Sequence, residues 1–335
     1  MKRVKSEWEK LKIGWEWWSK GWVGLAGESG FLVVLVLAMG VFTLSGQLLA
    51  AGQRGMKVHV DNILSNGGEE RAEPVNISDV GAPEISAEAA VVFDMDSGKW
   101  LWEKNSRVPK LPASTTKIMT ALVVLGAVDE GKLTLGQQVV VPEIATKADG
   151  QKVGFLAGEP VTVENLLYAL LLSSGNDAAE TLAAVYPGGR SAMVTAMNEK
   201  GEELGLERTN FTNPSGFDEY LHFTTAVDLT KIAVAALEDE RMAEMVSTVK
   251  ASFISLDGKF PHNVDNLNTL LSEVPGVKGV KTGWTEVAGE NLVTAVERGG
   301  HEEIIIVLKS KDRFEDSRKL IDWVFGNFSW PEGNL

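Results

Sequence analysis

The stretch "LPASTTKIMTALVVL", residues 111–125, determines how the rest of the sequence is interpreted. Its apolar residues predict a buried helix. Ser114 and Lys117 nevertheless stand three residues apart at its start, which places both side chains on one helical face. At a helix N-terminus the backbone N–H groups are free and the dipole favours negative charge. A partly desolvated Lys in that position can take a proton from a Ser hydroxyl.

Two interpretations of this pair remain open when it is taken alone. In the first, Ser114 is a nucleophile and Lys117 is its general base. In the second, Ser114 caps the helix and the Lys117 side chain extends to solvent. Because Ser-x-x-Lys is a common pattern, the second interpretation is favoured until other segments are considered.

A second stretch, "LLLSSGNDAAE", covers residues 170–180. It predicts that one helix ends and another begins at Ser174-Gly175-Asn176. The Ser174 hydroxyl suits a proton relay, and the Asn176 amide suits the orientation of a substrate amide. The alternative is an ordinary turn between helices with polar caps.

A third stretch, "GVKTGWT", covers residues 279–285 and predicts a strand. It carries Lys281 and Thr282, a cation and a hydroxyl that suit a substrate carboxylate. Gly283 lets another backbone approach closely. The alternative is a solvent-facing strand with one glycine.

Together and in this order, the three motifs resemble the active-site signature of penicillin-binding proteins and serine β-lactamases. The flanking sequences "PASTTKIMTALV", "NFTNPSGFDE" and "GVKGVKTGWTEVAGENLV" resemble the serine D-alanyl-D-alanine carboxypeptidase family, the low-molecular-mass penicillin-binding proteins. The resemblance covers about residues 85–328. It implies an α+β, β-lactamase/transpeptidase-like fold, in which helices flank an antiparallel sheet beside an all-α subdomain.

The resemblance also implies roles for individual residues. Ser114 would be the acylated nucleophile, Lys117 its general base, and Ser174 the group that passes a proton to the leaving D-Ala. The oxyanion hole would be the backbone N–H groups of Ser114 and Trp284. The implied substrate is a peptidoglycan stem peptide ending in D-Ala-D-Ala, with β-lactams as covalent inhibitors and without metal or cofactor. The implied substrate-binding residues are Asn176, Lys281, Thr282, Gly283, Trp284 and Arg313.

Three alternatives to a carboxypeptidase are compatible with the same motifs. A DD-endopeptidase or a β-lactamase would employ the same site, and a catalytically silent wall-binding protein would not turn over. The middle motif is Ser-Gly-Asn rather than Ser-Asp-Asn, and no Glu-x-x-Leu-Asn follows it, so the deacylating Glu of class A β-lactamases has no counterpart. The presence of all six key side chains argues against a silent protein.

The stretch "FLVVLVLAMGVFTLSGQLLAA", residues 31–51, predicts a transmembrane helix, since it is 21 residues long without a charge. All six Lys and Arg of residues 1–51 precede it. The positive-inside rule therefore predicts a single-pass protein of the bacterial cell membrane, with a cytoplasmic N-terminus and an extracytoplasmic catalytic domain. A cleaved signal peptide is the competing interpretation, and the lengths of the leader and of the apolar run favour the uncleaved anchor.

The other segments follow from this anchor. Residues 1–30 are the predicted cytoplasmic leader, in which Trp8, Trp15, Trp18 and Trp22 share one helical stripe, typical of a helix in the membrane interface. A dimerising coiled coil is the alternative. Residues 52–84 are rich in Gly, Glu, Asn, Pro and Ser and predict a flexible linker. Residues 85–330 are the predicted catalytic domain.

Composition and periodicity add further limits. The net charge of −14 makes nucleic acid an unsuitable partner, and the absence of Cys excludes thiol catalysis and Cys-ligated zinc. The four His residues form no HExxH pair. Periodicity predicts a hairpin from Ala89 to Trp102, three strands near the C-terminus, and helices at 115–128, 163–172, 177–186, 191–204, 225–238 and 312–326. The order strands, helices, strands, helix predicts an α+β domain.

Overall fold

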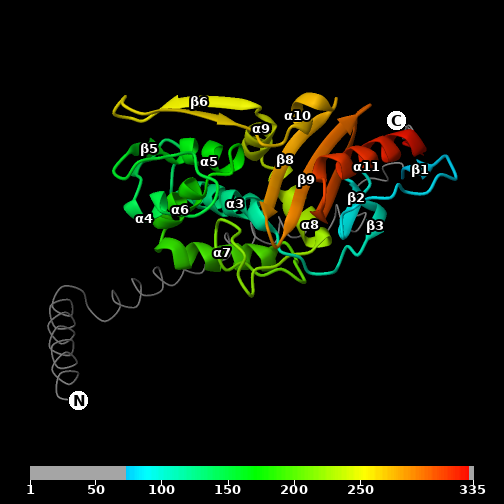
Figure 1. The fold of residues 1–335 in the computed structure, drawn as a ribbon, viewed down its shortest axis with the longest axis horizontal. Helices are drawn as coiled ribbons and strands as arrows, with labels where there is room; N and C mark the ends of the chain where they lie inside the picture. The colour runs from blue at the N-terminus through cyan, green and yellow to red at the C-terminus, as the bar shows by residue number, and fades with distance from the viewer. Residues whose placement is uncertain (1–72, 332–335) are drawn as a thin grey trace, which may run out of the picture. The chain divides into compact units, whose positions relative to one another are not determined.

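The computed structural model describes residues 73–331. At the centre of this region is a five-stranded antiparallel sheet in the order β3-β2-β10-β9-β8 (Figure 1). The N-terminal hairpin pairs with the last strand of the C-terminal meander, so the sheet joins both ends of the described chain. Its strands are β2 (Ala89–Asp94), β3 (Lys99–Lys104), β8 (Val277–Thr285), β9 (Gly289–Arg298) and β10 (His301–Ser310).

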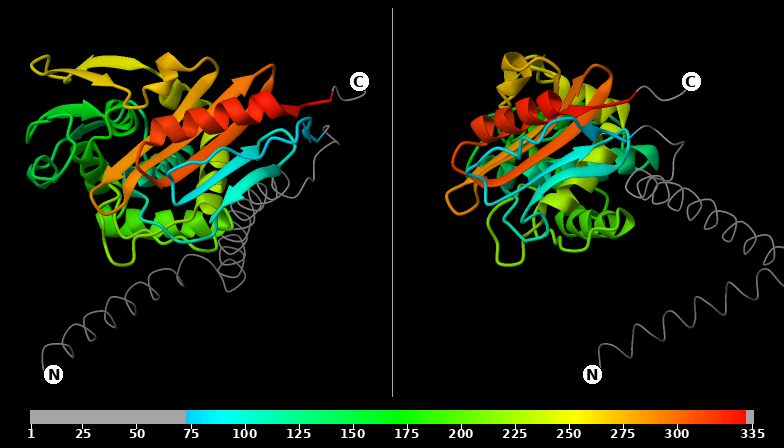
Figure 2. Two further views of the ribbon diagram at one scale, coloured as in Figure 1. Left: turned by 45° about the vertical axis from the view of Figure 1, so that its right-hand side comes forward. Right: turned by 90° about the vertical axis from the view of Figure 1, so that its right-hand side faces the viewer.

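Both faces of this sheet are covered. On β10, Ile304 and Ile306 belong to the core shared with the central helices, whereas Ile305 and Val307 belong to a second core beneath α11 (Arg313–Asn327). Figure 2 shows α11 lying across that second face. Burial on both faces explains why β10 is an unbroken apolar run rather than an alternating one.

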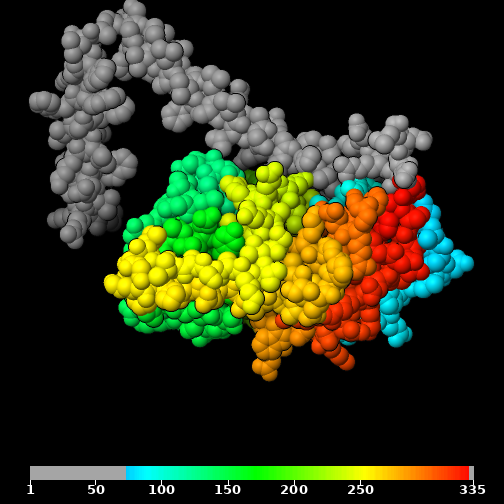
Figure 3. Space-filling view, turned by 90° about the horizontal axis from the view of Figure 1, so that it is seen from above, coloured from blue at the N-terminus to red at the C-terminus, as the bar shows by residue number. Residues whose placement is uncertain are grey.

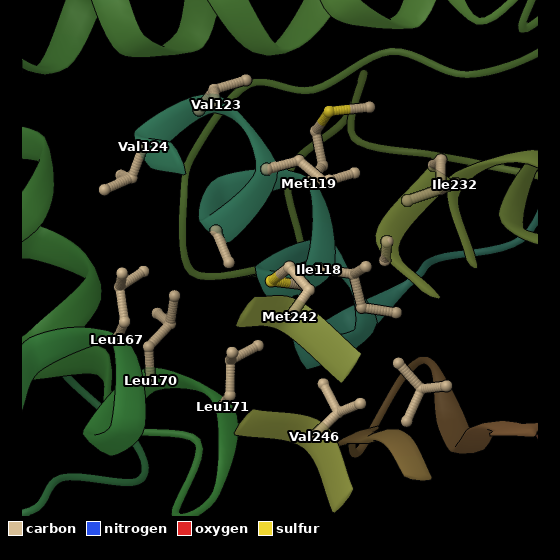
Figure 4. Packing of buried hydrophobic residues seen from close by; sticks show 14 of the residues in the cluster. Ile118, Met119, Val123, Val124, Leu167, Leu170, Leu171, Ile232, Met242 and Val246 are labelled. Atoms are coloured by element: carbon tan, nitrogen blue, oxygen red, sulfur yellow. The ribbon is translucent and has the colours of Figure 1, made fainter. Parts of the chain in front are cut away.

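The other face packs on a helical region centred on α3 (Thr116–Asp129), which is buried on nearly every side. A helix that is apolar all round belongs in the interior. Its side chains pack among those of neighbouring helices, as Figure 4 shows for Leu167, Ile232 and Met242. The surrounding helices are α4 (Glu143–Thr146), α5 (Val163–Leu171), α6 (Asn176–Val185), α7 (Gly189–Glu203), α8 (Ala226–Leu237) and α9 (Glu240–Ser247).

Several short elements complete the domain. A hairpin of β6 (Lys250–Ile254) and β7 (Pro261–Asp265) lies across the helical region and appears yellow over green in Figure 3. The remaining elements are η1 (Ala113–Thr115), α10 (Leu270–Glu273), and the pairs β4 (Gln138–Val140) with β5 (Pro160–Thr162) and β1 (Val75–Asn76) with β11 (Phe328–Ser329).

The predicted α+β class with an antiparallel sheet and flanking helices is confirmed. The six predicted helices agree with the observed ones to within two residues at each end. The periodicity of the sequence predicts neither the β4–β5 and β6–β7 pairs nor α9. These elements are short, and their strands depend on pairing partners that a local pattern cannot identify.

One predicted boundary needs correction. Residues 73–84 belong to the predicted flexible linker, yet β1 pairs with β11 and the Trp323 Nε1 donates a hydrogen bond to the Val80 carbonyl at 3.2 Å. This part of the predicted linker is therefore held against α11, and a domain start at residue 85 is too late. Indole and backbone contacts of this kind leave no signal in a Gly- and Glu-rich composition.

The predicted leader, residues 1–30, and the predicted span, residues 31–51, lie outside the described residues. Within residues 73–331, no helix is both long enough and apolar enough to cross a bilayer.

The Asp316 carboxylate ties α11 to the start of β2, and its removal tests this junction. It accepts hydrogen bonds from the Ser86 backbone N and hydroxyl, the Ala87 N and the Ser310 hydroxyl at 2.6–3.0 Å. Asp316→Ala is expected to lower the free energy of unfolding by about 2–4 kcal/mol, because several donors lose their acceptor. Asp322→Ala, at an exposed carboxylate of the same helix, is the control and should cost below about 0.5 kcal/mol. Equal losses in denaturant titrations of the two variants would contradict this account.

Candidate active site

Ser114 lies in η1, immediately before α3, in a turn that other elements hold in place. The preceding Ala113 has a left-handed backbone with φ of 50°, a conformation that a non-glycine residue keeps only when its surroundings impose it. Part of this constraint comes from Asn291 on β9, which is fully buried. Its Nδ2 donates to the carbonyls of Leu111 and Pro112 at 2.9 and 3.0 Å.

Lys117 stands one turn further along α3 and is fully buried. Its Nζ lies 2.9 Å from the Ser114 Oγ, 2.7 Å from the Asn176 Oδ1 and 2.7 Å from the Ser215 carbonyl oxygen. The three contacts come from three separate segments of the chain, which meet at one nitrogen. The Lys117 side chain therefore does not extend to solvent as in the second interpretation of the Ser-x-x-Lys pair, and the geometry favours the first.

The burial of Lys117 has a chemical consequence. Burial lowers the pKa of its amine from 10.5 to about 7, although the nearby Glu180 and Asp177 carboxylates act in the opposite direction. A large share of the amine is therefore neutral near neutral pH. A neutral amine offers a lone pair, which can accept the proton of the Ser114 hydroxyl 2.9 Å away.

The second motif forms the predicted turn between α5 and α6. Ser174 is buried there and has a left-handed backbone with φ of 58°. Asn176 begins α6; its Oδ1 accepts from Lys117, and its Nδ2 donates to the Asp149 carbonyl at 2.6 Å. The structure thus brings Asn176 to the Ser114–Lys117 pair, and Ser174 stands two residues before Asn176.

The third motif lies on β8, next to η1. A Cβ atom at Gly283 would lie 2.9 Å from the Pro112 carbonyl oxygen and 3.1 Å from the Ser114 N, so only glycine allows this approach. Lys281 and Thr282 are buried, and the Lys281 Nζ donates to the Thr282 carbonyl at 3.1 Å.

The charges on and around β8 are mutually repulsive. Burial holds the pKa of Lys281 well below its ordinary value, and the neighbouring Lys117 and Arg313 cations lower it further. The described part of the chain thus gathers three basic side chains, Lys117, Lys281 and Arg313, around one region, although the protein as a whole is acidic. Such a region suits an anionic group.

Two predicted substrate-binding residues differ in setting from the rest. Arg313 donates through Nη1 to the Gly283 carbonyl at 3.1 Å, and its Nε is buried with no hydrogen-bond partner among the described residues. Asp312 caps α11, so Arg313 is left to face β8 rather than to cap the helix. Trp284 is 60% exposed and follows Gly283 at the edge of the sheet.

A loop in "NFTNPSGFDE" contributes to the site, although no residue of this stretch is among the predicted site residues. The Ser215 carbonyl in this loop is a partner of Lys117. The loop is folded around Asn213, whose Oδ1 accepts from the N atoms of Ser215, Gly216 and Phe217 at 2.7–3.2 Å. The signal that could have identified it is the Asn-Pro-Ser-Gly turn.

His222 supports the helix that carries the site. Its Nδ1 accepts from the Thr212 backbone N at 3.1 Å, so Nε2 carries the proton and donates to the Thr116 hydroxyl at 2.8 Å. Burial lowers its pKa to about 4, which keeps the ring neutral. Among residues 73–331, no group of three or more His, Asp or Glu side chains could hold a metal ion.

Comparison with known proteins places these observations in a family. A family model described as D-alanyl-D-alanine carboxypeptidase, Peptidase S11, matches residues 76–312. The chain is 35% identical over 246 residues to D-alanyl-D-alanine carboxypeptidase DacF of Bacillus subtilis, covering 72% of this chain and 63% of the relative, less than two thirds of its length. It is also 35% identical over 254 residues to DacB2 of Mycobacterium tuberculosis, covering 73% of this chain and 84% of that protein.

A solved structure gives the same result for the fold. The crystal structure of the Streptomyces K15 DD-transpeptidase superposes with a TM-score of 0.70 at 32% identity, over 74% of this chain and all of that one.

The pKa of Lys117 leads to a stability prediction. As the pH falls below 10.5 the unfolded chain takes up a proton on Lys117, whereas the folded chain does so only near 7. Between these values the folded state loses about 1.4 kcal/mol of stability per pH unit through this group. The Lys117→Met variant has no amine at this position and therefore does not lose this stability as the pH falls. The melting temperature of the variant relative to the natural chain should therefore rise as the pH falls from 10 to 7 and level off below 7.

Thermal melts across this range measure the effect, with Lys147→Met, at an exposed lysine directly after α4, as control. A difference between the Lys117 variant and the natural chain that is constant with pH would show that the buried amine is not neutral.

Proposed function

The chain belongs to the D-alanyl-D-alanine carboxypeptidase family, and from that membership we propose that it removes the terminal D-Ala of peptidoglycan stem peptides through an acyl-enzyme on Ser114. The observation that carries this proposal is the buried Lys117 amine, 2.9 Å from the Ser114 Oγ and with a pKa of about 7. A serine hydroxyl attacks a peptide carbonyl only when a base is in hydrogen-bond reach and is unprotonated.

In the first half of the reaction, the Ser114 oxygen bonds to the carbonyl carbon of the scissile D-Ala-D-Ala amide. Lys117 takes the hydroxyl proton, and the negative charge on the carbonyl oxygen is held by the backbone N–H groups of Ser114 and Trp284. The C–N bond then breaks, and Ser174 relays the proton held by Lys117 to the departing D-Ala nitrogen. Asn176, which is fixed between Lys117 and Asp149, holds the substrate amide.

The terminal carboxylate of the substrate supplies the specificity. Lys281, Thr282 and Arg313 bind it, and their position beside Gly283 places the scissile bond over Ser114. In the second half, water attacks the ester carbonyl carbon, the ester bond to the Ser114 oxygen breaks, and the shortened peptide leaves with its new carboxylate. A proton from the attacking water restores the Ser114 hydroxyl.

A second candidate is transfer of the same acyl group to an amine, as in a transpeptidase. It is favoured by one observation, the full-length superposition of the Streptomyces K15 DD-transpeptidase on this fold. The acyl-enzyme is common to both reactions, and only the acceptor differs. Hydrolysis of cross-links or of β-lactams would also begin at Ser114.

The chemistry is tested with Ser114→Ala. The variant should fold, should gain no mass on incubation with penicillin, and should release D-Ala at least about 10⁴-fold more slowly than the natural chain. Intact-protein mass spectrometry and D-Ala assays on defined muropeptides measure both effects. Ser191→Ala, at an exposed serine on α7, is the control and should retain both. Covalent labelling of Ser114→Ala by penicillin would refute Ser114 as the nucleophile. A natural chain that penicillin labels but that forms only cross-linked products would favour the transpeptidase.

We also propose that residues 31–51 anchor the protein in the bacterial cell membrane, with the catalytic domain outside. The proposal rests on the 21-residue uncharged run and on the six cations that precede it. A chain lacking residues 1–51 should move from the membrane pellet to the supernatant, whereas the full chain should stay in the pellet after high-salt and alkaline washing. Full-length chain that is released by those washes would contradict the anchor, and a shortened mature N-terminus would favour the cleaved signal peptide.

A further inference from the structure

The loop of residues 149–158 contacts Asn176 of the candidate site. Two backbone carbonyls of this loop accept hydrogen bonds from Asn176. The side-chain Nδ2 donates to the Asp149 carbonyl at 2.6 Å, and the backbone N donates to the Gln151 carbonyl at 2.8 Å. Because the Asn176 Oδ1 contacts the Lys117 Nζ, the position of this loop is transmitted directly to the general base.

The same loop also contacts the carboxylate of Asp177, which lies near Lys117. The buried Asp177 accepts hydrogen bonds from the backbone N atoms of Val153, Gly154 and Phe155 at 2.8–3.2 Å. These donors partly neutralise the Asp177 charge, which is one of the two carboxylate charges acting on Lys117. The loop thus contributes to the electrostatic environment of the amine as well as to its geometry.

The far end of the loop is held by a buried contact between a carboxylate and an imidazole. The Glu159 Oε1 lies 2.6 Å from the His262 Nε2, and the Glu159 Oε2 accepts from the Leu156 N at 2.9 Å. The Phe155 ring packs against the His262 ring with centroids 4.7 Å apart. Glu159 and His262 are both buried, and neither is among the residues to which the proposed reaction assigns a role.

His262 lies on β7, and its hairpin connects the loop to the second motif. At the turn end, the Leu256 N donates to the Pro160 carbonyl at 2.8 Å. At the base, the Ser173 hydroxyl donates to the Asp265 carbonyl at 3.1 Å and the Leu267 N donates to the Leu172 carbonyl at 3.1 Å. The hairpin, which crosses the helical region in Figure 3, therefore contacts Pro160 at its turn end and Ser173, the residue before Ser174, at its base.

We propose that the buried Glu159–His262 pair positions the 149–158 loop against Asn176 and Asp177, and thereby fixes the environment of Lys117 during the acylation step of the proposed function. His262 is in this sense a positioning residue and touches no reacting group. The hairpin acts as the rigid support, and Phe155 and Leu156 are the points at which the pair holds the loop.

Loosening the loop is expected to favour the protonated form of Lys117. If the amides of residues 153–155 leave Asp177, its charge acts more strongly on the amine, and entering water also stabilises the ammonium form. Water that replaces the Asn176 oxygen as acceptor keeps that contribution nearly constant. The charged groups that face Lys117 are Asp177, Glu180 and the opposing Lys281, of which only Asp177 is contacted by the loop. The protonated share of Lys117 at neutral pH should therefore rise.

The test is the rate at which the purified full-length chain reacts with a fluorescent penicillin between pH 5.5 and 9.5. His262→Leu should move the acid limb of this profile upward by about half to one pH unit, which slows labelling at pH 6.5 by about three- to tenfold and leaves labelling at pH 9.5 within about twofold. His262→Gln, whose amide nitrogen can replace Nε2 as the donor to Glu159, should restore most of the natural profile.

Val264→Ala is the matched control, since Val264 is buried on the same face of β7 and contacts the core rather than Glu159. It should lower the melting temperature without moving the acid limb. If His262→Leu does not fold, Glu159→Gln takes its place, because it keeps the volume and a hydrogen bond but removes the charge, and it should shift the limb in the same direction by less.

An acid limb that coincides with that of the natural chain, in a folded His262→Leu or Glu159→Gln variant, overturns the inference and leaves a purely structural pair. An equal shift in Val264→Ala overturns it too. The proposed function fails separately: a natural chain that penicillin does not label refutes the Ser114 chemistry, and one that is labelled but releases no D-Ala refutes the carboxypeptidase while the comparison of acid limbs still decides the inference.

Discussion

The arrangement of this domain depends on one constraint, an amine that has been taken out of water. A buried lysine is costly unless the protein replaces its hydration shell or the group gives up its proton. Lys117 does both in part, with three oxygen partners from η1, α6 and the 213–217 loop and with a pKa lowered to about 7. Three segments far apart in the sequence must therefore converge on one atom, and the rest of the fold provides that convergence.

The convergence is possible because backbones approach one another closely at glycine. Gly283 brings β8 against η1, where a Cβ would be 3.0 Å from the Thr115 N. Gly216 brings the 213–217 loop against the same turn, where a Cβ would be 1.9 Å from the Ala113 carbonyl oxygen. The turn that carries Ser114 is thus enclosed by β8 and the 213–217 loop, and only glycine at positions 283 and 216 allows them to come this close. This enclosure explains how Ala113 can keep a left-handed backbone that would be unfavourable in an isolated chain.

The sequence predicted the parts of this arrangement that are local. The Ser114–Lys117 spacing, the turn at Ser174 and the β8 strand each follow from a short pattern, and the order of the motifs brought them together through the family resemblance. The Glu159–His262 pair and the Ser215 carbonyl could not be predicted in this way. A buried Glu–His contact joins residues from separate elements, and a backbone carbonyl has no signature in the sequence. The contact between α11 and residues 73–84 could not be predicted for the same reason, since it depends on one indole hydrogen bond and on the pairing of two very short strands.

The remaining feature of the site is the electrostatic repulsion among its basic side chains, Lys117, Lys281 and Arg313. The Arg313 cation, and Lys117 in its protonated form, lower the affinity of Lys281 for its proton. Burial also disfavours the charged forms of Lys281 and Arg313. A fold gains nothing from placing these charges together, so the cluster is a cost that other contacts must offset. Under the proposed function, the carboxylate of the substrate compensates the charges of Lys281 and Arg313 on binding. The cations are then stabilised in the complex rather than in the free protein, and the Lys117 amine, which must stay neutral to act as a base, remains the one member of the cluster with no carboxylate ligand. The same arrangement explains why the amine with the proton-transfer role is the one surrounded by fixed protein oxygens, since its position has to be set before the substrate arrives.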